Sequence, residues 1–165
     1  QRTIWNAKWR GERALLDRSG RPLDTTTLDP DGRIDAILAW SALPGASRHH
    51  WGTDIDVIDR AATAQGYRPQ LVPAEYAPGG VFHRLDAWLT ASMSRFGFYR
   101  PYARDLGGVR PEAWHLSHAD TARPACGGLT AEIMQEAIES ADIEGKERLI
   151  ERMDEIRERY VVERQ

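Results

Sequence analysis

The sequence predicts an α+β fold in which a small antiparallel sheet carries a polar site and helices surround the sheet. Residues 53–58 alternate polar and apolar side chains with the period of a strand, whereas several longer segments repeat apolar residues with the period of a helix. The 165 residues show no internal repeat and no shift of composition, so we expect one domain over residues 1–165.

The N-terminal part predicts two helices joined by a polar loop. Residues 3–17 carry Ile, Trp and Leu at helical spacing, and residues 18–28 are polar. Asp29 and Pro30 then match an N-cap and the first position of a helix. Apolar residues recur every three or four positions through about Trp40, so we expect the second helix to end there.

The alternating segment 53–58 predicts the first strand. Asp54 and Asp56 fall on one face of this strand, and Ile55 and Val57 fall on the other. We therefore expect Asp56 to point into a site while the two apolar side chains enter the core.

The middle of the chain predicts a long loop, a helix and two short strands. Residues 66–80 are rich in Gly, Pro and Tyr and favour the loop. Residues 81–96 form an amphipathic pattern that Gly97 ends. We expect one strand to begin at residue 98 and another to cover residues 114–116. The second of these would lie near the first strand of the chain.

The C-terminal part predicts two charged amphipathic helices. They cover residues 130–141 and 143–162, with Thr130 and Asp142 as N-caps. Their apolar stripes would pack residues 129–165 onto the domain as a helical extension, and their alternating Glu and Arg are typical of a solvated face.

Composition excludes several classes of protein. The net charge is −3 with no basic stripe, so we expect no nucleic-acid partner. No run of about 18 apolar residues predicts a transmembrane segment. Cys126 is the only cysteine, so no disulfide can form within the chain, and we expect it to be a packing residue. No signal peptide is visible, although one could have been removed before Gln1.

Two polar segments, residues 47–56 and 112–115, together contain the residue types of a catalytic zinc site. Such a site uses three His or carboxylate ligands, an open position for water and a nearby base. His49, Asp56 and His115 are the candidate ligands, and Glu112 is the candidate base.

Other residues in these segments compete for the same roles. His50 and Asp54 would share a face only on a helix, which Gly52 and the strand pattern disfavour. His118 follows His115 and is also available. His and Asp residues at such spacings are common in proteins that bind no metal. The residue types alone are therefore also compatible with ordinary solvated surface groups. Asp54 either orients a ligand histidine or is solvated.

Two stretches resemble the signature motifs of the zinc D-alanyl-D-alanine carboxypeptidases of the VanY and VanX type: Ser47-x-His49-x-x-Gly52-x-x-x-Asp56 and Glu112-x-Trp114-His115. The similarity covers about residues 30–120 and includes the lead-in Leu43-Pro44-Gly45-Ala46-Ser47. It implies the hedgehog/DD-peptidase type of α+β fold, whose small sheet carries the zinc site.

The resemblance also implies roles for individual residues. His49, Asp56 and His115 would bind one Zn²⁺ ion, and Glu112 would act as general base. Ser47 would help to seat the terminal residues of the substrate. Trp114 would support the strand that carries the metal and contribute to the substrate site.

A carboxypeptidase must hold a terminal carboxylate, for which the arginine fork is well suited. Arg48, Arg100 and Arg104 are the nearby candidates, and we expect Arg48 and Arg100 to bind substrate. The family carries an upstream Ser-x-x-Arg-Ser-x-x-x-Gln segment whose Arg grips the substrate. That segment is missing here, and our hypothesis is that the chain lacks an N-terminal part.

The function predicted first is therefore that of a zinc metallopeptidase acting on peptidoglycan stem peptides as a D-alanyl-D-alanine carboxypeptidase. The alternatives are an L,D-carboxypeptidase, a cell-wall endopeptidase, or a non-catalytic zinc-bearing module that binds peptide. Asp54, His50 and Trp51 depart from the usual family pattern at the mouth of the site and leave the exact substrate open. We expect a bacterial periplasm or cell envelope as location, with the cytoplasm not excluded.

Overall fold

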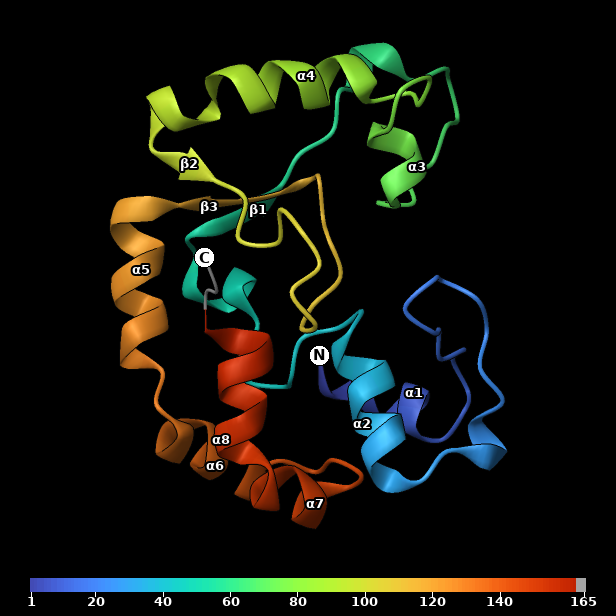
Figure 1. Cartoon of the computed structure of the whole chain (residues 1–165), viewed down its shortest axis with the longest axis vertical. Helices are drawn as coiled ribbons and strands as arrows, with labels where there is room; N and C mark the ends of the chain where they lie inside the picture. The colour runs from blue at the N-terminus through green and yellow to red at the C-terminus, as the bar shows by residue number, and fades with distance from the viewer. Residues whose placement is uncertain (163–165) are drawn as a thin grey trace.

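The computed structural model describes residues 1–162 and has a three-stranded antiparallel sheet at its middle. The strand order is β1-β3-β2, so β3 is the central strand. The sheet lies between the long helix α4 and a larger group of helices that contains both α1 and α8 (Figure 1). The strands are β1 (Asp54–Asp56), β2 (Phe98–Tyr99) and β3 (His115–His118).

The regular secondary structure of the described residues is mainly helical, and most of the helices are short. In chain order the α-helices are α1 (Arg2–Trp9), α2 (Pro30–Leu38), α3 (Pro73–Tyr76), α4 (His83–Ser92), α5 (Ala119–Gly128), α6 (Ala131–Glu139), α7 (Lys146–Glu151) and α8 (Met153–Ile156). Single turns of 3-10 helix lie at Thr25–Thr27, Arg48–Trp51, Arg60–Ala62 and Met93–Phe96, and a π-helical turn at Arg157–Val161 follows α8.

Two separate apolar clusters hold the helices on either side of the sheet. The larger one joins α1 and α2 to α6, α7 and α8 through residues such as Trp5, Ile37, Ile138 and Ile156, all at most 1% exposed. The smaller one is aromatic and packs Tyr76 and Phe82 against Trp114, which directly precedes β3. Trp114 therefore connects the site strand to the end of the molecule that contains α3 and α4.

Two of the predicted helix caps are confirmed. Asp29 Oδ1 accepts a hydrogen bond from the backbone N–H of Gly32 at 2.7 Å, and Pro30 is the first residue of α2. The Thr130 hydroxyl accepts a bond from the backbone N–H of Ile133 at the start of α6. The third predicted cap is wrong, because Gly145 rather than Asp142 precedes α7.

The lengths predicted for several elements also need correction. The first helix ends at Trp9 instead of residue 17, because Gly11 adopts a left-handed conformation with φ 76° and the chain turns away. The predicted loop 66–80 contains the short helix α3. The predicted helix 143–162 is divided into α7, α8 and the π-helical turn. The helix α5 was not predicted, and Pro124 lies inside it.

The two faces of β1 do not follow the expected rule. Ile55 is 47% exposed instead of entering the core, whereas Asp54 is only 6% exposed. The reason is that β1 is an edge strand whose inner face packs on a polar network instead of on apolar side chains. The acidic side chains do share one face, as predicted, but Asp54 is buried there whereas Asp56 is exposed.

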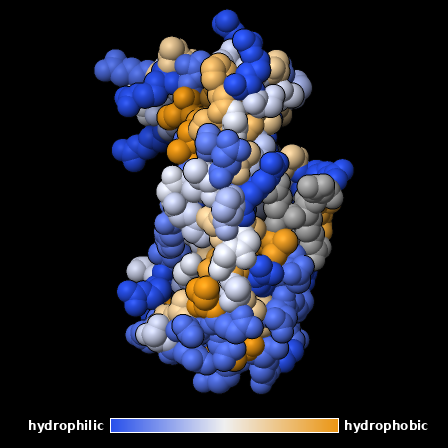
Figure 2. Space-filling model, turned by 90° about the vertical axis from the view of Figure 1, so that its left-hand side faces the viewer, coloured by the Kyte–Doolittle hydropathy of each residue, from blue (hydrophilic) through white to orange (hydrophobic). Residues whose placement is uncertain are grey.

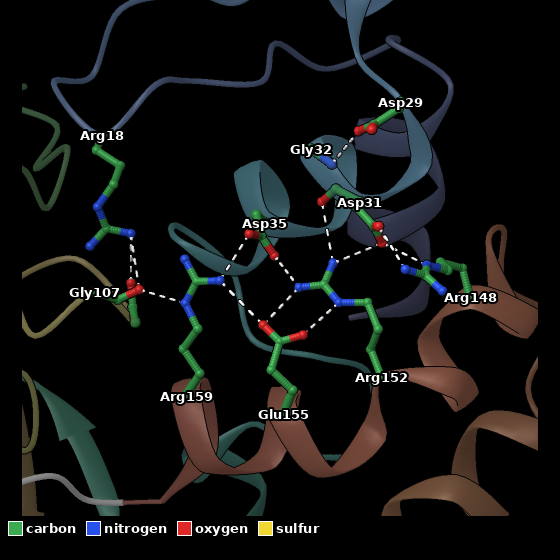
Figure 3. Close-up of polar contacts among 11 residues, drawn as sticks. Arg18, Asp29, Asp31, Gly32, Asp35, Gly107, Arg148, Arg152, Glu155 and Arg159 are labelled. Atoms are coloured by element: carbon green, nitrogen blue, oxygen red, sulfur yellow. Dashed lines mark hydrogen bonds and ion pairs between the residues drawn. The ribbon is translucent and has the colours of Figure 1, made fainter.

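Arginine–carboxylate pairs fasten the C-terminal helices to α2. Arg152 contacts Asp35 at 2.7 Å and Asp31 at 3.1 Å, and it also pairs with Glu155 (Figure 3). Arg159 contacts Asp35 at 2.9 Å and also donates to the carbonyl of Gly107. The contacts with Asp31 and Asp35 join segments that are more than 100 residues apart in the sequence.

We expect the Arg152→Met variant to lose about 1–2 kcal/mol of unfolding free energy, because the Arg152 head group is mostly buried while its acidic partners are partly solvated. Urea denaturation of the variant and the parent would measure this loss. Arg21→Met is the control, since Arg21 is exposed and its ion pair is with the nearby Asp17. Equal midpoints for all three proteins would contradict a stabilising role of the network.

The face that carries α5 is mostly hydrophilic, with hydrophobic residues in separate patches (Figure 2). Within residues 1–162 no helix combines the length and apolar character needed to cross a membrane.

Candidate metal and catalytic site

The register of the sheet brings the predicted ligands together. Asp56 of β1 pairs directly with His115 of β3, so their side chains emerge side by side on one face. His49 reaches the same point from the 3-10 turn Arg48–Trp51, which ends at Gly52 in a left-handed conformation with φ 72°. One ligand atom from each of the three side chains lies within 4.8 Å of the other two.

The distances and donor types fit a small divalent cation. Asp56 Oδ1 lies 3.6 Å from His49 Nε2 and 3.6 Å from His115 Nδ1. Tetrahedral coordination with zinc bonds of about 2.0–2.1 Å requires ligand atoms roughly 3.3 Å apart. Two imidazole nitrogens and one carboxylate oxygen are also the donors that a catalytic zinc site uses. The residues present therefore fit zinc.

The second nitrogen of each histidine is bound to the same residue, Asp54. His49 Nδ1 lies 3.2 Å from the backbone carbonyl of Asp54, and His115 Nε2 lies 2.8 Å from its carboxylate. In each imidazole, the nitrogen that lies farther from Asp56 is bound to Asp54, and the other nitrogen points towards Asp56. The sequence left open whether Asp54 orients a ligand histidine or is solvated. In the structure Asp54 is buried and its carboxylate contacts His115.

Asp54 is itself held by a buried polar network. Its carboxylate accepts hydrogen bonds from Arg48 Nε at 2.9 Å, from Thr53 Oγ1 at 2.6 Å and from the Ser117 hydroxyl. Burial alone would raise the pKa of Asp54, but these hydrogen bonds, that of His115 and the charge of Arg48 hold the pKa far below its ordinary value. Asp54 is therefore a carboxylate anion inside the protein.

Glu112 lies beside the cluster without being one of its three members. It is three residues before His115, and the turn between them places Glu112 Oε2 3.1 Å from His115 Nδ1. Its side chain is 20% exposed and lines a cavity beside the cluster, so a water molecule in this cavity can reach it. This is the position that a general base requires.

The protonation of His115 depends on its two acidic neighbours. Burial would lower the pKa of His115, but hydrogen bonds and charge interactions with Asp54 and Glu112 raise the pKa to about 9. The proton on Nδ1 must therefore leave when a cation binds to that nitrogen.

A cavity of about 200 Å³ opens onto the cluster. Among the residues predicted to bind substrate, Ser47, Arg48 and Trp114 line this cavity. Arg100 does not. It lies in a separate depression and is bound to Asp86 at 2.8 Å and to the carbonyl of Ala113 at 2.9 Å. His50 is exposed and outside the cluster.

Sequence reasoning missed residues that contribute to the site. Ser117 is fully buried and contacts both Arg48 and Asp54. Its position two residues after His115 on a strand could have indicated that the two share a face. Tyr160 and Val161 at the C-terminal end line the cavity, and no local pattern indicated this.

The fold and the cluster together define a class of protein. An α+β scaffold that presents two histidines and one carboxylate beside a further glutamate is typical of metal-dependent hydrolases. The chain belongs to the VanY family of D-alanyl-D-alanine carboxypeptidases, which its residues 1–121 match. The family assignment that the two motifs indicated is thus confirmed, and α6, α7 and α8 lie beyond the matched region.

Two proteins of Haemophilus influenzae, both described as uncharacterized, are similar to the chain. One is 34% identical over 122 residues, which cover 73% of this chain and 93% of that protein. The other is 49% identical over 43 residues, which cover 26% of this chain and 30% of that protein. No solved structure matches the chain significantly.

Proposed function

We propose that the protein is a zinc-dependent carboxypeptidase that removes the terminal D-alanine from peptidoglycan stem peptides. The observation that carries this proposal is the convergence of His49, Asp56 and His115, with Glu112 beside them, in a chain of the VanY family. His49, Asp56 and His115 hold the ion, and when bound Zn²⁺ supplies Lewis acidity that activates water and polarises a carbonyl.

Glu112 performs the proton transfers in this proposal. Its carboxylate accepts a proton from the attacking water and passes it to the nitrogen of the leaving D-alanine. Its carboxylate lies next to the three ligands, while its backbone N–H bonds to the carbonyl of Tyr102 at 3.0 Å and steadies the turn. The proton taken from water and the proton delivered to the leaving amine therefore pass through one carboxylate.

The substrate peptide occupies the cavity next to the cluster. Ser47 and Trp114 line it and are the side chains we assign to substrate binding. The exposed sides of His49 and Asp56 leave the cluster accessible from solvent, as a peptide substrate requires. Such a substrate places the protein in the periplasm or cell envelope of a bacterium, and this location remains a prediction.

The test is incubation of the zinc-loaded chain with purified muropeptides that end in D-alanyl-D-alanine, with the products identified by mass. We expect the loss of one terminal alanine, inhibition by EDTA and recovery on addition of Zn²⁺. No loss from these substrates, with loss of the single terminal alanine from tetrapeptide muropeptides, would favour an L,D-carboxypeptidase, and cleavage of cross-links would favour an endopeptidase. Peptide binding without any cleavage would indicate a non-catalytic peptide-binding module instead of an enzyme.

A further inference from the structure

The buried residue Asp54 connects to both histidines of the cluster, and it does so through different groups. Its carboxylate oxygen Oδ1 lies 2.8 Å from His115 Nε2, and its backbone carbonyl lies 3.2 Å from His49 Nδ1. The Asp54 side chain has no solvent exposure, so its contact with His115 does not compete with water. One residue therefore determines the orientation of two rings that come from distant parts of the chain.

The register of the sheet explains why Asp54 reaches this place. Asp54 pairs with Ser117 while Asp56 pairs with His115, so the four side chains form two adjacent rows on one face. Asp56 is partly exposed and lies on the open side of His115, whereas Asp54 lies on its buried side. His115 is held between the two carboxylates, one at each ring nitrogen.

Arg48 supplies the positive charge that this arrangement needs. Its side chain is 2% exposed, and its Nε lies 2.9 Å from Asp54 Oδ1. Its Nη2 donates to Ser117 Oγ and to Tyr99 Oη, both at 2.9 Å, and its guanidinium lies over the Trp51 ring. A buried carboxylate without such a partner would be strongly unfavourable.

We propose that Asp54 is the positioning residue for both metal-binding histidines and that Arg48 is its buried counter-ion instead of the anchor for the substrate carboxylate. This inference rests on the proposed metal site. Asp54 keeps the proton of neutral His115 on Nε2, so the lone pair of Nδ1 points towards Asp56 and Glu112. A histidine ligand oriented in this way by a carboxylate binds metal more tightly.

The assignment has a consequence for substrate binding. The Arg48 head group is already bound to Asp54, Ser117 and Tyr99, so recruiting it for a peptide carboxylate would break the network behind His115. The C-terminal carboxylate of the substrate is therefore held by another group. This separates the requirements for binding metal from those for selecting substrate.

The first experiment compares the Zn²⁺ affinity of the parent and of Asp54→Asn by competition with a chromophoric chelator. We expect the variant to bind Zn²⁺ about 10–100-fold more weakly, as on loss of an outer partner of a ligand histidine. Asp31→Asn is the matched control, because it removes another arginine-paired carboxylate that lies on α2, outside the cavity lining. We expect this control to bind Zn²⁺ like the parent.

A second variant covers the case in which Asp54→Asn does not fold with Arg48 unpaired. The double variant Arg48→Met with Asp54→Ala removes both charges together, and we expect the same weakening of Zn²⁺ binding. Unchanged affinity in a folded variant of either kind would overturn the positioning role. If the parent itself binds no Zn²⁺, the proposed function fails. If the parent and the variant bind Zn²⁺ equally well, the proposed function stands and only the positioning role fails.

A measurement on the unaltered protein tests the tautomer directly. Nitrogen NMR of the zinc-loaded protein labelled with ¹⁵N-histidine should show His115 bound to Zn²⁺ through Nδ1 and protonated on Nε2. Metal bound through Nε2 of His115 would overturn the proposal, because that nitrogen would then not be held by Asp54.

Discussion

The Glu112→Gln variant should retain bound Zn²⁺ but turn over muropeptides about 10²–10⁴-fold more slowly than the parent. Glutamine has the same shape as glutamate but cannot accept a proton from water. Glu112 is not one of the three clustered ligands, so its replacement leaves His49, Asp56 and His115 in place. Metal analysis of the purified variant and mass detection of released alanine give the two measurements.

The control for this prediction is Glu136→Gln on α6, which changes an exposed glutamate outside the cavity lining. We expect its turnover to equal that of the parent. If Glu112→Gln were as active as this control, Glu112 would not be the general base. Loss of the metal from Glu112→Gln would instead identify Glu112 as a ligand.

The His49→Ala variant should lose both the metal and the activity. His49 supplies one of three donor atoms, and two remaining ligands hold zinc far more weakly than a complete site. We expect the affinity for Zn²⁺ to fall by more than the roughly 10–100-fold that loss of an outer partner causes. Chelator competition measures the affinity, and the muropeptide assay measures turnover.

The neighbouring histidine offers a matched control. His50 is adjacent to His49 in the same 3-10 turn, but its side chain is exposed and outside the cluster. His50→Ala should therefore bind Zn²⁺ and cleave substrate like the parent. Equal losses in the two variants would indicate that the turn had been disrupted, and metal retained by His49→Ala would remove His49 from the ligand set.

The sequence was most informative where the signal was local. The capping residue Asp29 and the proline after it marked the start of α2, and Gly97 marked the end of the helical segment before β2. The first helix was overestimated, because the left-handed turn at Gly11 interrupts an apolar pattern that continues in the sequence. Local patterns thus indicated where elements begin more reliably than how far they extend.

The polar face of β1 shows what periodicity cannot decide. Alternation correctly placed Asp54 and Asp56 on one side, but it could not show which side is buried. That choice depends on Arg48 and Ser117, which satisfy the Asp54 carboxylate inside the protein. A hydrogen-bonded charge can replace an apolar side chain in the interior, and no rule based on hydrophobicity anticipates it.

The sequence by itself determined the family, the two motifs and the residue types able to bind a metal. Only the tertiary structure decided that Asp56 pairs with His115, that Asp54 binds the far nitrogen of both histidines, and that Tyr160 lines the cavity. The physical reason is that periodicity and capping are properties of neighbouring residues. The relative position of segments about 60 residues apart depends on strand register and on packing of the whole core.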